Sequence, residues 1–231
     1  MNIARWVSAW LLDRVIVVGF HLRYLVSSAV PAAYSRGERA PVVLVQGAYE
    51  NWHFLRPLGD RLNRLGHPVH VVRELRHNRG PVGPSADIVA RYLIERDLRR
   101  VIIVAHSKGG IMGKQLMVTD GVAERIDRMV AINAPFSGSR LARLVPRTTL
   151  GEFTPTNGTL SALARHTEAN SRIVSIFSRL DPVILEGCRL EGARNIELPL
   201  SGHFRPLTGG ALLDVVVGAV EDAQSPTQGT E

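Results

Sequence analysis

The feature that most constrains this chain is a short apolar run that ends in a serine between small residues. Residues 101–104 read Val-Ile-Ile-Val, as in a strand that is buried on both faces. The run continues directly into Ala105-His106-Ser107-Lys108-Gly109-Gly110. A strand that turns abruptly into a helix forces strained backbone angles, so small residues are needed two positions before and two after the turn residue. Ala105 and Gly109 meet that requirement, and Gly110 lets the helix pack tightly against the sheet.

Apolar runs and amphipathic stretches alternate through the rest of residues 40–221. Strands are expected at 42–45, 69–72, 101–104, 128–132, 173–177 and 195–198. Helices are expected at 54–65, 85–96 (with Ser85 as N-cap), after 107, and at 208–220. This order predicts an α/β fold with a mostly parallel sheet and helices on both faces. We also expect a short cap at 135–170 and a disordered polar tail at 222–231.

Residues 1–35 form a separate N-terminal segment. Four polar or charged residues, Asp13, Arg14, His21 and Arg23, interrupt its apolar stretch, so it fits neither a spanning helix nor a signal peptide. An apolar stripe at helical spacing is made by Val7, Leu11, Val15, Val18, Leu22 and Leu25. The stripe predicts an amphipathic helix that docks on its own domain or on a partner subunit. Alternatively, residues 1–30 contact a membrane surface, with Trp6 and Trp10 at the headgroup layer. We expect a cytoplasmic protein in either case.

Composition argues against several other classes of protein. The net charge is +7, but the 28 basic residues are scattered and no basic stripe carries interleaved aromatics, so nucleic-acid binding is not expected. Cys188 is the single cysteine, which excludes an intrachain disulfide and a cysteine zinc cluster. We interpret it as a partly buried apolar thiol. No metal or organic cofactor is implied.

The serine segment resembles the nucleophile elbow of the α/β-hydrolase family, with Ala105 in place of the usual first glycine. In that family the chain order is Ser, then Asp or Glu, then His. The segment Ser178-Arg179-Leu180-Asp181-Pro182-Val183 is similar to the loop that carries the acid. The segment Leu200-Ser201-Gly202-His203-Phe204 is similar to the loop that carries the base. The resemblance, which covers residues 40–220, therefore implies Ser107 as nucleophile, His203 as base and Asp181 as supporting acid.

Other residues compete for two of these roles. Glu186 and Glu191 lie near Asp181 in the sequence, and either carboxylate stays open as the acid. The other histidines are His21, His53, His67, His70, His77, His106 and His166. None of them follows the last predicted strand, which favours His203. His106 adjoins the serine but would point away from it, so we interpret it as a packing residue.

The same resemblance implies an oxyanion hole and a substrate site. Gln46-Gly47-Ala48 follows the strand at 42–45 and is similar to the family's His-Gly-x loop, with Gln46 replacing His. Backbone amides of Ala48 and Lys108 would then stabilise charge on oxygen. Gln46, Gly47 and Phe136 would contact substrate.

A further segment narrows the resemblance to bacterial triacylglycerol lipases. Residues 133–139 (Asn-Ala-Pro-Phe-Ser-Gly-Ser) are similar to the lipase segment Thr-Pro-x-x-Gly-Ser, with Ala134 replacing Thr. Five apolar cap residues either line an acyl site or simply pack within the cap: Leu141, Leu144, Val145, Leu150 and Phe153. The implied activity is cleavage of carboxylic esters through an acyl-serine intermediate, on a small acyl ester or lipid-like substrate. The alternatives are an acyltransferase or thioesterase with the same residues, and a non-catalytic binding protein of the same fold.

Overall fold

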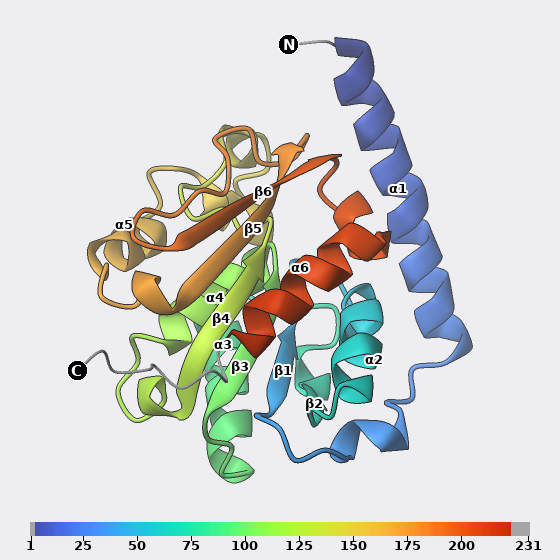
Figure 1. Ribbon diagram of the computed structural model, residues 1–231. Helices are drawn as coiled ribbons and strands as arrows, with labels where there is room; N and C mark the ends of the chain where they lie inside the picture. Colours follow the sequence, from blue (N-terminus) through green and yellow to red (C-terminus); the bar gives the residue numbers. More distant parts are fainter. Residues whose placement is uncertain (1–2, 223–231) are drawn as a thin grey trace, which may run out of the picture.

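The protein is built on one parallel sheet, seen in a computed structural model that describes residues 3–222 (Figure 1). Its strands are β1 (Val42–Val45), β2 (Val69–Val71), β3 (Val101–His106), β4 (Ile126–Ile132), β5 (Ile173–Leu180) and β6 (Arg194–Ser201). Their order across the sheet is β2-β1-β3-β4-β5-β6, and every neighbouring pair is parallel. The carboxyl ends of all six strands therefore meet at one edge, where loops from distant parts of the sequence come together.

Helices cover both faces of the sheet. The α-helices are α1 (Ile3–Val26), α2 (Arg56–Arg64), α3 (Val82–Glu95), α4 (Lys108–Leu116), α5 (Gly158–Arg165) and α6 (Gly210–Glu221). The 3-10 helices are η1 (Ala32–Ser35), η2 (Trp52–Phe54), η3 (Arg73–Leu75), η4 (Ala123–Arg125), η5 (Arg140–Leu144), η6 (Thr149–Phe153), η7 (Asn170–Arg172) and η8 (Arg205–Thr208). Side chains of α3, α4 and α5 share one apolar core with the sheet, and side chains of α1, α2 and α6 share the other. This arrangement confirms the predicted fold class.

The sequence patterns located all six strands to within a few residues, but one helix start was wrong. α3 begins at Val82 rather than after Ser85, which lies inside the helix and is buried. Its hydroxyl accepts a hydrogen bond from the side chain of Lys108 instead of capping the helix. The segment between β4 and β5 contains η5, η6, α5 and η7. Apart from Asp222, the predicted tail at 222–231 lies outside the described residues.

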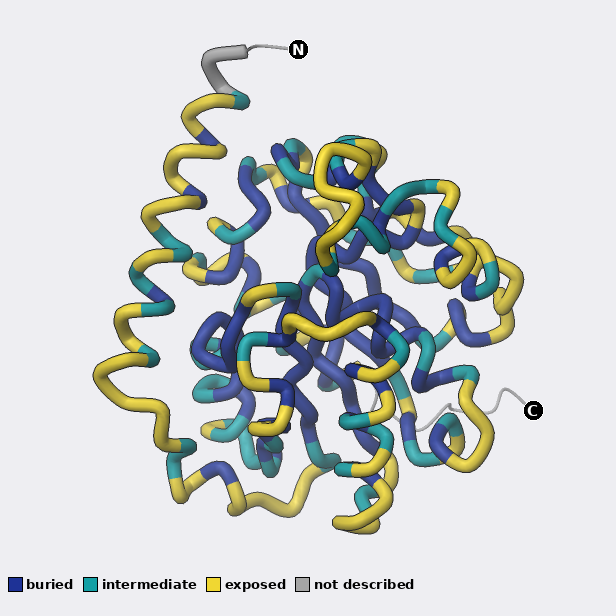
Figure 2. The backbone as a smooth tube through the Cα atoms, turned by 180° about the vertical axis from the view of Figure 1, so that it is seen from behind, coloured by how far each residue is buried: buried dark blue, intermediate teal, exposed yellow. Residues whose placement is uncertain are grey.

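Helix α1 packs against the domain with one face and leaves the predicted apolar stripe exposed (Figure 2). The buried side chains of α1 are Ala9, Asp13 and Phe20, whose spacing places them on one side of the helix. Val15, Leu22 and Leu25, from the predicted stripe, are 69%, 56% and 78% exposed. The helix thus docks on its own domain, but through a different face from the one that the stripe predicts. None of the helices within residues 3–222 combines the length and hydropathy that a membrane-spanning segment needs.

Candidate functional site

A sharp, strained turn presents Ser107 at the end of β3. Ser107 has φ 51° and ψ −121°, a backbone conformation that residues other than glycine rarely adopt. Its amide donates to the carbonyl of Ile132 on the neighbouring strand, at 2.8 Å. A Cβ on Gly109 would lie 2.1 Å from the carbonyl oxygen of Val45, and one on Gly110 would lie 2.4 Å from the Cβ of Ala134. Gly109 and Gly110 are therefore required because the start of α4 passes directly against the backbone of β1 and the side chain of Ala134.

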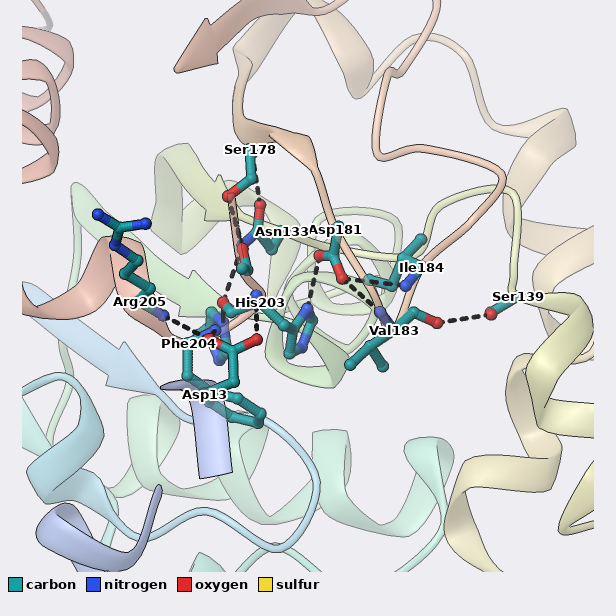
Figure 3. Close-up of polar contacts among 12 residues, drawn as sticks. Asp13, Asn133, Ser139, Ser178, Asp181, Val183, Ile184, His203, Phe204 and Arg205 are labelled. Carbon is teal, nitrogen blue, oxygen red and sulfur yellow. Dashed lines mark hydrogen bonds and ion pairs between the residues drawn. The ribbon is translucent and has the colours of Figure 1, made fainter. Parts of the chain in front are cut away.

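His203 and Asp181 meet as a buried hydrogen-bonded pair (Figure 3). The imidazole Nδ1 of His203 lies 2.7 Å from Oδ2 of Asp181, although the two residues are 22 positions apart in the sequence. The other carboxylate oxygen, Oδ1, accepts from the amides of Val183 and Ile184, at 2.8 and 3.0 Å. The turn after β5 thus fixes the carboxylate, and the carboxylate fixes the orientation of the ring.

Two opposing effects set the pKa of the His203 imidazole. Burial disfavours the charged ring and lowers the pKa, but the charge of Asp181 and its hydrogen bond raise it, and the charges of Glu50 and Asp13 add to this. The net result is a pKa above the ordinary value of 6.5. Since the carboxylate accepts at Nδ1, a neutral His203 carries its proton there and keeps a lone pair on Nε2.

The structure brings Ser107 to the same edge of the sheet as this pair. Ser107 directly follows His106, whose ring centroid lies 4.8 Å from that of His203. Within residues 3–222 the Ser107 hydroxyl makes no hydrogen bond, so no direct bond joins it to His203. Such bonds are often long in unliganded enzymes and tighten only when substrate is bound.

The backbone of His203 is held from two sides. Its carbonyl oxygen accepts from the side-chain amide of Asn133 at 2.8 Å and from Nε2 of His106 at 3.1 Å. Its amide donates to the buried carboxylate of Asp13, from helix α1 (Figure 3). Asn133 also accepts from the amide of Ser178 at 2.9 Å, which ties the ends of β4 and β5 together. None of these supports was identified from the sequence.

A second buried carboxylate and imidazole pack against the first pair, so His106 makes polar contacts beyond the packing role that the sequence suggested. Nδ1 of His106 lies 2.7 Å from Oε1 of Glu50, and both side chains are buried. Because a carbonyl oxygen only accepts, the contact with the carbonyl of His203 requires a proton on Nε2 of His106. The other Glu50 oxygen accepts from the amide of Gly47 at 2.8 Å. Glu50 therefore connects the loop after β1 to the loop of His203.

The loop at residues 46–48 lies against the turn of Ser107. A Cβ on Gly47 would come within 3.0 Å of the Ser107 Cβ. The side chain of Gln46 is buried and donates to the carbonyl of Arg76 at 3.1 Å, so it ties the loop at residues 46–48 to the segment at Arg76. Among the described residues, the Ala48 amide donates to no acceptor. The Lys108 amide is the first of α4, where an amide has no acceptor within its own helix.

The Lys108 side chain is buried, although long cations usually reach solvent. Its ammonium donates to Oδ1 of Asn78 at 2.8 Å and contacts the carbonyl of Gly80 at 2.5 Å and the hydroxyl of Ser85 at 3.2 Å. Burial lowers the pKa of this ammonium to about 8, although the charge of Glu152 opposes the shift. Lys108 thereby attaches the loop before α3 to the turn that carries Ser107.

A small apolar pocket of about 100 Å³ opens at Ser107. Its walls include four of the five apolar cap residues, namely Leu141, Val145, Leu150 and Phe153, together with Val183 and Ile184. The fifth, Leu144, is 77% exposed and does not line it. The structure does not bring Phe136 to this pocket either. Phe136 packs in the core and lines a larger cavity beside α4 and α5.

Apart from His106, the competing acids and histidines do not join this cluster. Glu186 pairs with Arg140 at 3.4 Å, and Glu191 is exposed. Among the described histidines, His106 is the one whose ring packs against His203. Cys188 is fully buried, and burial, reinforced by the charge of Asp181, holds the pKa of its thiol well above the ordinary value. It packs with Phe177 and Ile184 as an apolar thiol.

Comparison with known proteins was made by sequence and by shape. No protein-family model matches the sequence, and no curated protein matches it. In shape, the chain is similar to the mature form of the lipase BlEst2 from Bacillus licheniformis, with a TM-score of 0.63 and 15% identity over 80% of this chain and 96% of that chain. It is similar to a carboxylesterase from the thaumarchaeon Nitrososphaera gargenis, with a TM-score of 0.61 and 13% identity over 81% and 93% of the chains. This chain has the α/β-hydrolase fold.

A third solved structure extends the range of chemistry found on this fold. The enol-lactonase from Burkholderia xenovorans LB400 matches with a TM-score of 0.56 and 16% identity over 80% of this chain and 94% of that chain. Identities this low establish the α/β-hydrolase fold alone, because one fold hosts many activities. Function therefore has to be argued from the cluster at the carboxyl edge of the sheet.

Proposed function

We propose that this protein is a serine hydrolase that cleaves small carboxylic esters through an acyl-Ser107 intermediate. The observation that carries the proposal is the buried His203–Asp181 hydrogen bond at 2.7 Å, at the same sheet edge as a serine with φ 51°. A buried carboxylate that accepts from Nδ1 leaves the opposite ring nitrogen as a base. A serine on such a strained turn is presented at the edge of the sheet, where a base can reach its hydroxyl.

The reaction begins when the hydroxyl of Ser107 attacks the carbonyl carbon of the ester. Nε2 of His203 takes the hydroxyl proton as the new C–O bond forms, and Asp181 stabilises the resulting imidazolium. The amides of Ala48 and Lys108 stabilise the negative charge on the carbonyl oxygen. His203 then gives its proton to the leaving alcohol. A water molecule repeats the sequence on the acyl-serine and releases the acid.

The pocket at Ser107 supports a short acyl group. Its volume of about 100 Å³ is well below the 300–1,000 Å³ of pockets that enclose drug-sized ligands. The walls are largely aliphatic, so they suit an alkyl chain rather than a charged group. Phe136 is not part of this wall and is not proposed as a substrate contact. Acyl transfer to an alcohol and thioester cleavage would use the same acyl-serine and differ only in the acceptor or the leaving group.

The test is hydrolysis of p-nitrophenyl acetate, butyrate and octanoate by the full chain. We expect acetate and butyrate to be the better substrates, and Ser107→Ala to reduce kcat by at least about 10⁴-fold. Ser137→Ala, at an exposed serine in the segment after β4, is the matched control and should retain full activity. Undiminished turnover in Ser107→Ala would refute the assignment. Labelling of Ser107 by a fluorophosphonate without ester turnover would indicate a different acceptor or leaving group.

A further inference from the structure

Helix α1 reaches the proposed active site through one buried carboxylate. Asp13 is fully buried and accepts three hydrogen bonds from consecutive amides at the start of η8. The amide of His203 donates to Oδ2 at 2.6 Å, and the amides of Phe204 and Arg205 donate to Oδ1 at 3.0 and 2.9 Å. Residues separated by about 190 positions in the sequence are thus joined at the residue that would act as base.

The loop at His203 is built to accept this carboxylate. A Cβ on Gly202 would lie 2.8 Å from Oδ1 of Asp13, and Gly202 has φ 123°, so both space and backbone conformation require glycine there. The His203 peptide is then fixed at its amide by Asp13 and at its carbonyl by Asn133 and His106. With Asp181 holding the ring, the imidazole has little freedom to move.

We propose that Asp13 is a positioning residue for His203, so that helix α1 is part of the working enzyme. This inference rests on the proposed ester hydrolysis. In Asp13→Asn the side-chain oxygen can still accept from Phe204 and Arg205, but the NH₂ group replaces the acceptor of the His203 amide. A displacement of about 1 Å at a reacting group costs up to about 100-fold in rate. The charges of Asp181, Glu50 and Asp13 act on the His203 ring, and the ring of His106 packs against it. Of these, Asp13 is the one supplied by α1.

The test compares Asp13→Asn with Phe20→Leu, a control on the same buried face of α1. Phe20 packs on Phe54 with ring centroids 4.8 Å apart and, unlike Asp13, offers the His203 loop neither a charge nor a hydrogen-bond acceptor. Both variants should melt at a lower temperature than the wild type. We expect Asp13→Asn alone to lower kcat, by about 10- to 100-fold, with little change in KM. Of the two variants, only Asp13→Asn should lower the pKa of His203, which NMR titration measures in a Ser107→Ala background.

The outcomes separate this inference from the proposed function. If the wild type hydrolyses esters and Asp13→Asn keeps both its kcat and the His203 pKa, the positioning role is wrong. The same holds if Phe20→Leu changes kcat and the pKa equally, because the effect would then be general loosening of α1. If the wild type neither hydrolyses esters nor reacts with a fluorophosphonate, the proposed function fails. The NMR titration would still report whether Asp13 acts on His203.

The outer face of α1 is a separate feature with its own evidence. Its six most exposed apolar side chains are Leu11, Val15, Val18, Leu22, Leu25 and Val26, with exposures from 54% to 87%. A helix of 24 residues is about 36 Å long, so these apolar side chains form an extended stripe. Figure 2 shows α1, with many exposed residues, along one flank of the molecule. Exposed apolar areas of this extent mark an interaction surface rather than ordinary surface scatter.

Charge indicates what covers the stripe. The exposed charged side chains of α1, from Trp6 onward, are Arg14 and Arg23, because Asp13 is buried. The guanidinium of Arg14 lies 5.1 Å from the centroid of the Trp10 ring, which is also exposed. A second copy of this chain, itself carrying a net charge of +7, would bring like charges together along the paired helices. An anionic surface complements both the arginines and the net charge.

We infer that the outer face of α1 binds the surface of an anionic lipid bilayer, with the helix lying along it. The test is co-sedimentation with vesicles of phosphatidylcholine alone and of equimolar phosphatidylcholine and phosphatidylglycerol. The triple variant Val15→Ser, Leu22→Ser, Leu25→Ser should bind the mixed vesicles about 100-fold more weakly or worse. Arg23→Gln should weaken binding about fivefold, and added salt should remove this difference. The matched control is Ile94→Ser, at an exposed apolar residue of α3, and it should bind as the wild type does.

Three results would overturn the lipid assignment. The first is failure of the wild type to sediment with the anionic vesicles, and the second is equal sedimentation of the wild type and the triple variant. The third is a dimer of the wild type in solution that the triple variant abolishes, which would identify a second copy as the occupant. None of these results depends on ester hydrolysis.

Discussion

Replacing Asp181 with asparagine should reduce kcat by about 10⁴-fold, although the two side chains have nearly the same shape. The reason lies in the donors around the carboxylate. Amides of Val183 and Ile184 donate to Oδ1, at 2.8 and 3.0 Å. Two amide donors require an acceptor at that position, so the asparagine keeps its oxygen there and turns its NH₂ group towards His203.

The NH₂ group reverses the hydrogen bond to the imidazole. It donates but does not accept, so Nδ1 of His203 has to accept and the ring proton moves to Nε2. An N–H at Nε2 cannot take the proton of Ser107. The expected 10⁴-fold loss corresponds to about 5.4 kcal/mol of transition-state stabilisation, at about 1.36 kcal/mol for each factor of ten.

The assay compares kcat for the wild type, Asp181→Asn and Asp181→Ala on p-nitrophenyl acetate. Alanine removes the carboxylate but imposes no donor on Nδ1, so Asp181→Asn should be no more active than Asp181→Ala despite its closer shape. Nitrogen-15 NMR should find the proton of neutral His203 on Nε2 in Asp181→Asn. Activity of Asp181→Asn within tenfold of the wild type, or a proton that stays on Nδ1, would refute the reasoning.

Three further predictions follow from the geometry. Gly109→Ala should lower the free energy of unfolding by about 3 kcal/mol because its Cβ meets the Val45 carbonyl. Gly218→Ala in α6, with open space around it, should raise the free energy of unfolding by about 0.5–1 kcal/mol. Denaturant titration measures both changes, and equal effects would contradict the packing argument. Lys108→Ala should lower the free energy of unfolding by about 2–4 kcal/mol, since Oδ1 of the buried Asn78 loses the Lys108 ammonium as its donor. A change below about 0.5 kcal/mol in the same titration would show that this acceptor does not depend on Lys108. The log of kcat/KM should rise with pH along a limb centred above 6.5, because neutral His203 is the base and its pKa is raised; a limb centred below 6.5 would contradict that direction.

The parts of the site that could be predicted from sequence are those with a local signature. Runs of β-branched residues located the strands, and the small residues around Ser107 reflect a clash that the structure makes explicit at 2.1 Å. Asp181 and His203 were indicated by the resemblance of their segments to loops of the α/β-hydrolase family, and each follows a strand at the edge where loops of a parallel sheet meet. These signals lie in the residues next to each site residue, so they can be recognised without knowing which distant residues the fold brings into contact with it.

The supporting contacts could not be predicted, since they depend on residues far apart in the sequence. The stripe on α1 identified an apolar face, but both sides of this helix are apolar, and periodicity does not say which one docks. An aspartate among apolar residues was the one available sign that the face of Asp13 is buried against donors. The burial of Lys108 and the His106–Glu50 pair likewise depends on loops 28 and 56 residues away.

The most direct test of the account is the second-order rate constant for labelling of the full chain by a fluorophosphonate, with the modified residue identified by peptide mass spectrometry. If Ser107, His203 and Asp181 act together, the wild type is labelled on Ser107 and His203→Gln reacts at least about 10³-fold more slowly. Labelling of another residue, or an unchanged rate in His203→Gln, would contradict the claim that His203 activates Ser107.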